Sequence, residues 1–145
     1  MQSVIYEWAP CVKGLSLGIV GVGEIGSRVA EWAASAGMIV YKNDPPKAAK
    51  GVPGLVPLAE IADKCDIITF HTTLERGGEY PSFHLADKDF FNSLKKCRLL
   101  INASRGEVVD NVALLDALKC GKVGDIALDV WENEPYIDNE LLAKA

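Results

Sequence analysis

The chain has 145 residues, a length that fits one domain better than two. Hydrophobic residues make up 49% of the chain, enough for a sizeable core, and the net charge of −5 argues against broad binding to nucleic acid or to an anionic membrane. We find no signal-peptide pattern and no apolar run near the roughly 20 residues of a membrane-spanning helix. The four cysteines stand far apart without a CxxC pair, so we expect reduced thiols, no metal site and a cytoplasmic protein.

Short apolar runs alternate with segments of helical periodicity along the chain. In chain order, the pattern predicts a strand over 15–21, a helix over 25–36, a strand over 38–42, a short helix over 58–62, a strand over 66–70, a helix from 88 to about 95, a strand over 98–102, a helix over 112–120 and a strand over 126–130. Asp87 and Asn111 are the expected N-caps of the last two helices. The last helix is expected to place Val112, Leu115 and Leu118 on one face.

The predicted strands are apolar throughout, which is typical of a parallel sheet covered on both faces. Strands that alternate with helices give right-handed crossovers and helices on both sides of the sheet. The predicted fold class is therefore α/β, a Rossmann-type doubly wound parallel sheet in a single domain over residues 1–145. Val4, Ile5 and Trp8 resemble the end of a helix, and residues 138–145 resemble an unfinished one, so we expect a truncated fragment.

A glycine-rich motif, GVGEIG at residues 21–26, follows the first predicted strand and opens the first helix. It matches the G-x-G-x-x-G fingerprint of dinucleotide-binding folds, and Asp44 stands at the end of the next strand, about 20 residues on, as the fingerprint expects. We expect Gly21 to permit the tight turn, Gly23 to leave room for the pyrophosphate, and Gly26 to let the helix pack closely on the sheet.

The N-terminus of this first helix should face the cofactor's phosphates with its unpaired N–H groups and partial positive charge. We therefore count Glu24 and Ile25, in the first turn, among the cofactor-binding residues. Asp44 is expected to accept hydrogen bonds from the adenosine ribose, with Pro45 beside it at the cofactor. A carboxylate there repels a 2′-phosphate, so the predicted cofactor is NAD rather than NADP.

Three further motifs follow: HTTL at residues 71–74, NASRGEVVD at 102–110 and LDVWENEP at 128–135. They resemble the H-T-P-L, N-x-x-RG-x-x-VD and LDV-x-x-x-EP elements of the D-isomer-specific 2-hydroxyacid dehydrogenases, with Thr73 in place of the family's proline. The resemblance implies an NAD-dependent oxidoreductase that moves a hydride from C2 of a 2-hydroxy acid to NAD. It also implies that the family's catalytic histidine and its substrate domain lie outside this chain.

The resemblance assigns catalytic roles to Arg105 and Glu134. Arg105 would hold the substrate's carboxylate and polarise its C2 oxygen, for which a planar, permanently charged guanidinium is suited. Glu134 would orient the absent histidine, and Asp129 would lie near the nicotinamide carboxamide. We interpret Glu132 as a bystander and His84 as a structural or surface residue. The remaining residues expected at the cofactor are His71, Thr72, Ala103 and Ser104, with His71 taken as a satisfied histidine rather than an acid–base catalyst.

Within the family, NDPP at residues 43–46 and the long loop over 78–85 favour an enzyme that oxidises a phosphorylated 2-hydroxy acid. Another dehydrogenase of the family, acting on phosphoglycerate, glycerate or lactate, stays open, as does a non-catalytic NAD-sensing module. The resemblance also implies a homodimer for the intact protein, formed largely through a long helix whose tail alone begins this chain. We therefore expect the dimer to be weakened here, and the chain to bind NAD without turnover.

Overall fold

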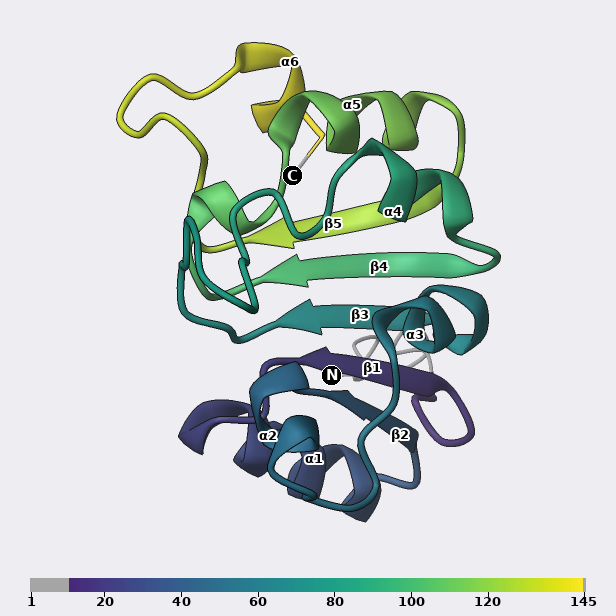
Figure 1. Ribbon diagram of the computed structural model, residues 1–145. Coiled ribbons are helices and arrows are strands. Elements are labelled where there is room, and N and C mark those ends of the chain that lie inside the picture. Colours follow the sequence, from purple (N-terminus) through teal and green to yellow (C-terminus); the bar gives the residue numbers. More distant parts are fainter. Residues whose placement is uncertain (1–10, 145) are drawn as a thin grey trace, which may run out of the picture.

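A single parallel sheet of five strands organises residues 11–144, the part of the chain that the computed structural model describes. The expected helix end near Val4, Ile5 and Trp8 lies outside these residues. The strands lie in the spatial order β2-β1-β3-β4-β5, and all arrows in Figure 1 point the same way. The predicted doubly wound parallel sheet is confirmed, with the strand order reversing direction between β1 and β3. The strands are β1 (Ser16–Val20), β2 (Ile39–Asn43), β3 (Ile67–Phe70), β4 (Cys97–Asn102) and β5 (Val123–Leu128).

Helices lie on both faces of the sheet, as expected (Figure 1). Three of them, α3, α4 and α5, pack side by side on one face. On the other face α1 packs against β1 and β2. Strand β5 lies at the opposite edge of the sheet, and its Asp125 and Ala127 are exposed. The helices are α1 (Glu24–Ser35), α2 (Pro45–Ala49), α3 (Leu58–Lys64), α4 (Lys88–Ser93), α5 (Asn111–Lys119) and α6 (Asn139–Leu142), with a 3-10 turn, η1 (Gly106–Val108).

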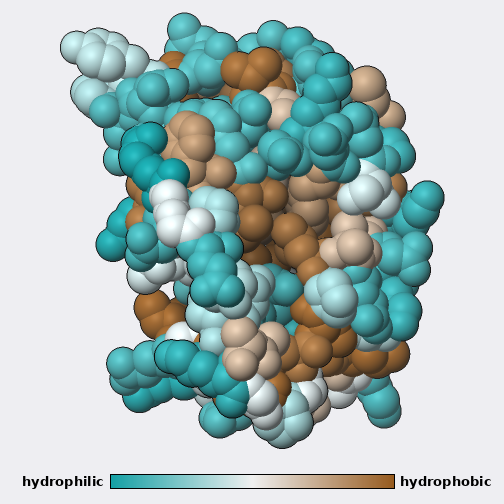
Figure 2. All heavy atoms as spheres, viewed as in Figure 1, coloured by the Kyte–Doolittle hydropathy of each residue, from teal (hydrophilic) through white to brown (hydrophobic). Residues whose placement is uncertain are grey.

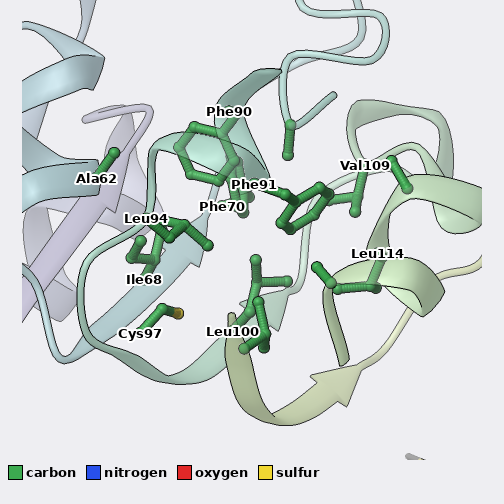
Figure 3. Packing of buried hydrophobic residues seen from close by; sticks show 14 of the residues in the cluster. Ala62, Ile68, Phe70, Phe90, Phe91, Leu94, Cys97, Leu100, Val109 and Leu114 are labelled. Atoms are coloured by element: carbon green, nitrogen blue, oxygen red, sulfur yellow. The ribbon is translucent and has the colours of Figure 1, made fainter. Parts of the chain in front are cut away.

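The larger core lies between the sheet and the layer of α3, α4 and α5 (Figure 3). Phe70 of β3 meets Phe90 of α4 edge to face, with ring centroids 6.0 Å apart, and both Leu100 and Leu114 are fully buried. On the α1 side, Leu17 and Ile19 of β1 pack with Ala33 of α1 in a smaller core, and partly buried hydrophobic residues pack against it. Burying an aromatic or aliphatic side chain contributes about 1.5–3 kcal/mol, so the larger core, which buries more of them, contributes most of the hydrophobic stabilisation.

One helix was not expected from the sequence, and another begins at a different N-cap residue. Residues 45–49 form α2, where the prolines predicted only a strand end; proline suits the first turn of a helix, whose N–H groups need no intrahelical partner. The N-cap of α5 is Asp110 rather than Asn111, since the Asp110 carboxylate accepts hydrogen bonds from the N–H groups of Val112 and Ala113. The predicted cap of α4 at Asp87 is confirmed.

The buried face of α5 and the start of β5 were also predicted wrongly. Val112 is 74% exposed, and the helix instead buries Ala113, Leu114 and Ala117, with Leu115 and Leu118 partly buried against the core. Strand β5 begins at Val123 and ends at Leu128, so Asp129 lies just past the strand. Its polar first half is strand because it pairs with β4, from Cys97 opposite Val123 onward, and pairing outweighs composition.

A buried carboxylate ties the amino ends of the strands together. Asp66 accepts hydrogen bonds from the backbone N–H of Ser16 at 2.9 Å and from its hydroxyl at 2.6 Å, and lies 3.3 Å from the Lys96 ammonium. Burial acts to raise the pKa of Asp66, but these hydrogen bonds outweigh it and lower the pKa. Behind this cap, burial raises the pKa of the Cys65 and Cys97 thiols to about 12, so they behave as small hydrophobic side chains.

Candidate active site

The carboxyl ends of β1, β2 and β3 border a cleft of about 420 Å³, at the place where the strand order reverses. Ligands of open α/β sheets bind at such a switch point. Figure 2 shows hydrophobic residues gathered at the centre of the face seen in Figure 1, with hydrophilic residues around them. Six residues expected at the cofactor line the cleft: Gly21, Gly23, Asp44, Pro45, His71 and Thr72. The other side of the cleft is formed by the loop after β3, including Tyr80, Ser82 and Leu85.

The three glycines of the motif occupy different surroundings. Gly21 has φ of +91°, and a Cβ there would lie 2.7 Å from the backbone of His71 and Thr72, so the turn passes the end of β3 in close contact. A Cβ at Gly26 would overlap the carbonyl oxygen of Gly21, so α1 packs directly on the turn. A Cβ at Gly23 would meet no heavy atom within 4 Å. The fold therefore requires the first and third glycines, and the second leaves room in the cleft.

Gly23 is also the N-cap of α1 and makes no side-chain cap for it. The first N–H groups of a helix have no intrahelical partner, so they are free to bind an anion there. Glu24 and Ile25 are exposed in this first turn and do not line the cleft. The Glu24 carboxylate lies 3.4 Å from the guanidinium of Arg28 on the helix surface. Their side chains therefore point to solvent, and a cofactor contact would come from their backbone.

Asp44 is held at the cleft by two backbone groups. Its Oδ2 accepts a hydrogen bond of 3.0 Å from the N–H of Val22, and its Oδ1 accepts one of 3.1 Å from the N–H of Lys47. The Lys47 ammonium in turn donates to the carbonyl of Val22. These contacts fix the carboxylate between the glycine turn and α2. The sequence analysis did not predict the part played by Lys47. The available signal was an acidic residue three positions before it, the spacing of an N-cap contact.

His71 follows β3 and passes close to the glycine turn, where its backbone N–H donates to the carbonyl of Val20 at 2.7 Å. Its Nε2 lies 2.9 Å from the hydroxyl of Thr69, whereas its Nδ1 is buried without a partner in the described residues. One ring nitrogen of His71 therefore has a partner among the described residues, and the other is buried at the edge of the cleft without one. Burial lowers the pKa of His71 and favours the neutral ring.

The turn after β4 carries Arg105, and a buried asparagine shapes it. Asn102 is 1% exposed; its Oδ1 accepts hydrogen bonds from the N–H of Ser104 at 3.1 Å and from its hydroxyl at 2.7 Å, and its Nδ2 donates to the carbonyl of Arg105 at 3.0 Å. The backbone carbonyl of Asn102 also accepts a hydrogen bond of 3.0 Å from the N–H of Asp129. Sequence reasoning gave Asn102 no role, although it begins the motif. Ala103 is exposed at the same turn.

Arg105 and Glu134 line one hollow of about 340 Å³ beside the ends of β4 and β5. The exposed Arg105 guanidinium donates to the carbonyl of Ser104 at 2.7 Å, and Glu134 accepts the N–H of Trp131 at 2.6 Å. A Cβ at Gly106 would overlap the carbonyl of Trp131, so the two turns lie in direct contact. The structure thus brings the two expected catalytic residues together.

Several expected cofactor residues lie outside the first cleft. Gly26 lies on the buried face of α1, and the others are at the ends of β4 and β5 or on the surface of α1: Glu24, Ile25, Ala103, Ser104 and Asp129. Among residues 11–144, no group of three or more His, Cys, Asp or Glu side chains could hold a metal ion. None of the helices over the same range is long and apolar enough to span a bilayer.

Residues 7–145 match the family model described as D-isomer specific 2-hydroxyacid dehydrogenase, NAD binding domain. The chain is 50% identical over 131 residues to erythronate-4-phosphate dehydrogenase of Bacteroides fragilis, a match that covers 90% of this chain and 38% of that protein. The chain therefore spans little more than a third of the length of this curated relative.

Two solved structures have the same fold, with about 30% sequence identity to this chain. NAD-dependent formate dehydrogenase from Staphylococcus aureus, in complex with NAD, matches with a TM-score of 0.77 and 30% identity over 90% of this chain and 39% of that one. D-mandelate dehydrogenase of Rhodotorula graminis matches with a TM-score of 0.77 and 31% identity over 92% of this chain and 40% of that one.

Proposed function

This chain belongs to the D-isomer-specific 2-hydroxyacid dehydrogenase family, as its NAD-binding domain, and we propose that it serves an enzyme that oxidises 4-phospho-D-erythronate at C2 to the 2-oxo acid. The observation that carries the proposal is the pairing of two sites at one sheet edge. A dinucleotide cleft with open space at Gly23 lies beside a hollow that holds Arg105 and Glu134.

The residues of the cleft fit NAD. Gly23 offers space that a side chain would fill, the first turn of α1 offers N–H groups, and Asp44 presents a fixed carboxylate. We assign the pyrophosphate to Gly23 and this helix turn, and the adenosine ribose to Asp44 and Pro45. Such a carboxylate disfavours a 2′-phosphate. The residues that would receive the nicotinamide are Ala103, Ser104 and Asp129, at the ends of β4 and β5.

The chemistry at C2 requires a fixed substrate and a place for one proton. When bound, NAD supplies the ring that accepts the hydride from C2. Arg105 binds the substrate's carboxylate with its forked N–H groups and polarises the C2 oxygen. Because its side chain is exposed, it can turn from the carbonyl of Ser104 to the substrate. Glu134 orients the histidine that takes the hydroxyl proton, a residue that the proposal places in polypeptide outside this sequence.

The choice of 4-phosphoerythronate rests on the 50% identity to the B. fragilis enzyme and on the long loop at residues 78–85. It is tested on the full-length polypeptide by measuring NAD reduction with 4-phosphoerythronate, 3-phosphoglycerate, glycerate and D-lactate. The value of kcat/KM should be highest for 4-phosphoerythronate, by at least about 100-fold over the unphosphorylated acids. Equal or higher values with any of the other acids would reject the assignment.

For the chain of 145 residues alone, we propose NAD binding without turnover, in a cytoplasmic protein. Arg105 and Glu134 favour an enzyme over an NAD-sensing module, and a catalytic histidine in the full reading frame would decide between these two. We further propose that the intact protein is a homodimer and that this chain associates weakly. Stable interfaces bury at least about 1,000 Å², so sedimentation of micromolar samples should show mainly monomer for this chain.

A further inference from the structure

A stack of three side chains in the loop after β3 faces three carboxylates from other parts of the chain. The rings of Phe83 and His84 are parallel within 15°, with centroids 4.0 Å apart, and the Arg76 guanidinium lies over the Phe83 ring, 4.7 Å from its centroid. The carboxylates that contact the side chains of Arg76 and His84 are Glu107, Asp110 and Glu132. We call the loop over residues 75–85 the cleft loop, because it forms a wall of the cofactor cleft.

His84 makes the principal contact. Its Nε2 lies 2.6 Å from Oε1 of Glu132, and its Nδ1 lies 3.8 Å from Oδ2 of Asp110. The side chain of Glu132 is 14% exposed, and its second oxygen accepts the N–H of Asn111 at 3.2 Å. The backbone N–H of His84 donates to the carbonyl of Glu107 at 2.8 Å. A partly buried pair with this geometry is held more firmly than an ordinary surface ion pair.

The backbone conformation of His84 also indicates that its contacts hold this residue in place. Its φ is +49°, in the left-handed region, where few residues other than glycine are found. Histidine and asparagine tolerate this region better than most side chains, yet the conformation costs about 1 kcal/mol and persists where surrounding contacts enforce it. The contacts to Glu132, Asp110 and Glu107 are the ones that do so here.

The cleft loop is closed on itself just before His84. Buried Ser82 donates its N–H to the carbonyl of Glu75 at 2.8 Å and its hydroxyl to the carbonyl of Thr73 at 2.6 Å, and it accepts the N–H of Glu75 at 2.7 Å. Ser82 and Leu85, on either side of His84, both line the cofactor cleft, together with Glu79 and Tyr80. A shift of His84 would therefore move the wall of the cleft.

The partners of His84 connect it to the hollow that holds Arg105 and Glu134. Glu107 lines the hollow that holds Arg105, and Glu132 lies between Trp131 and Glu134, both of which line it too. We propose that His84 is a positioning residue: through its pair with Glu132 it fixes the cleft loop against the two turns that carry Arg105 and Glu134, and so holds the cofactor cleft in its NAD-binding form. The inference rests on the proposed function for the identity of the cofactor as the ligand of the cleft.

The test separates this role from general stabilisation. His84→Asn keeps a residue that tolerates positive φ but is too short to reach Glu132, and Glu132→Gln keeps an acceptor for Asn111 without the charge. The matched control is Glu140→Gln, which removes an exposed pair with Lys119 of 2.7 Å far from the cleft. NAD affinity is measured by calorimetry at a temperature where every variant is fully folded, and amide hydrogen exchange of residues 75–85 is followed without NAD.

Both cleft variants should raise the Kd for NAD about threefold to tenfold, the range for losing one partly buried hydrogen-bonded pair. The double variant should bind NAD no more weakly than the single variant with the higher Kd, because both substitutions act on the same contact. Exchange in the cleft loop should accelerate in both, and Glu140→Gln should change neither quantity. Unchanged exchange in the loop, an unchanged Kd, or additive effects in the double variant would each overturn the proposal. NAD binding with these effects but no dehydrogenase activity in the full-length protein would overturn the proposed function alone.

Discussion

Replacing Gly23 with alanine should weaken NAD binding and leave the fold intact. The φ of Gly23 is −74°, which alanine adopts, and the new methyl group would meet no heavy atom within 4 Å. Stability should therefore stay constant or rise by up to about 1 kcal/mol, because alanine has fewer conformations to lose on folding. The methyl group would fill the space assigned to the pyrophosphate. Displacing the phosphates from the first turn of α1 should cost at least about 1.4 kcal/mol, a tenfold rise in Kd.

The matched control is Gly26→Ala, three residues further along the same motif. There the methyl group would overlap the carbonyl oxygen of Gly21, so we expect a loss of about 1–3 kcal/mol of stability through overpacking. Urea unfolding gives the stability of both variants, and calorimetry gives the Kd for NAD. A Gly23→Ala chain that binds NAD as tightly as the parent would refute the placement of the pyrophosphate. Equal destabilisation by the two substitutions would refute the reading of the glycine geometry.

Three further outcomes are expected. Asp44→Ala should weaken NAD binding by about 1–3 kcal/mol and relax the preference against NADP, and equal affinity of the unmodified chain for both cofactors in calorimetry would count against this role. Because the pKa of Asp66 is lowered in the folded chain, its contribution to stability is complete above the unfolded pKa, about 3.9, and is lost as the pH falls through the folded pKa. Urea unfolding at a series of acidic pH values should show this loss, and Asp66→Asn should reduce the dependence of the unfolding free energy on pH. At neutral pH, iodoacetamide should modify exposed Cys120 and spare Cys65 and Cys97, whose pKa values are about 12, as mass spectrometry before and after denaturation can show.

Local patterns in the sequence were sufficient to predict the parallel α/β fold and several residues that line the cleft at the carboxyl ends of β1, β2 and β3. The glycine spacing at residues 21–26 and the position of Asp44 depend on one strand, one turn and one helix, so they are readable without the rest of the chain. The same holds for the cap of α4 at Asp87. The joint placement of Arg105 and Glu134 came from resemblance to a family, and the hollow that they share agrees with it.

Tertiary structure decided what distant residues do to one another. The pairing of His84 with Glu132 joins residues 48 positions apart, and the contacts between Ser16 and Asp66 join residues 50 apart, so no local pattern marks them. Pairing with β4 also made strand out of the polar start of β5, against its composition. Propensity and periodicity describe a residue's neighbours along the chain, whereas strand pairing and buried charge depend on groups that only the folded chain brings within a few ångströms.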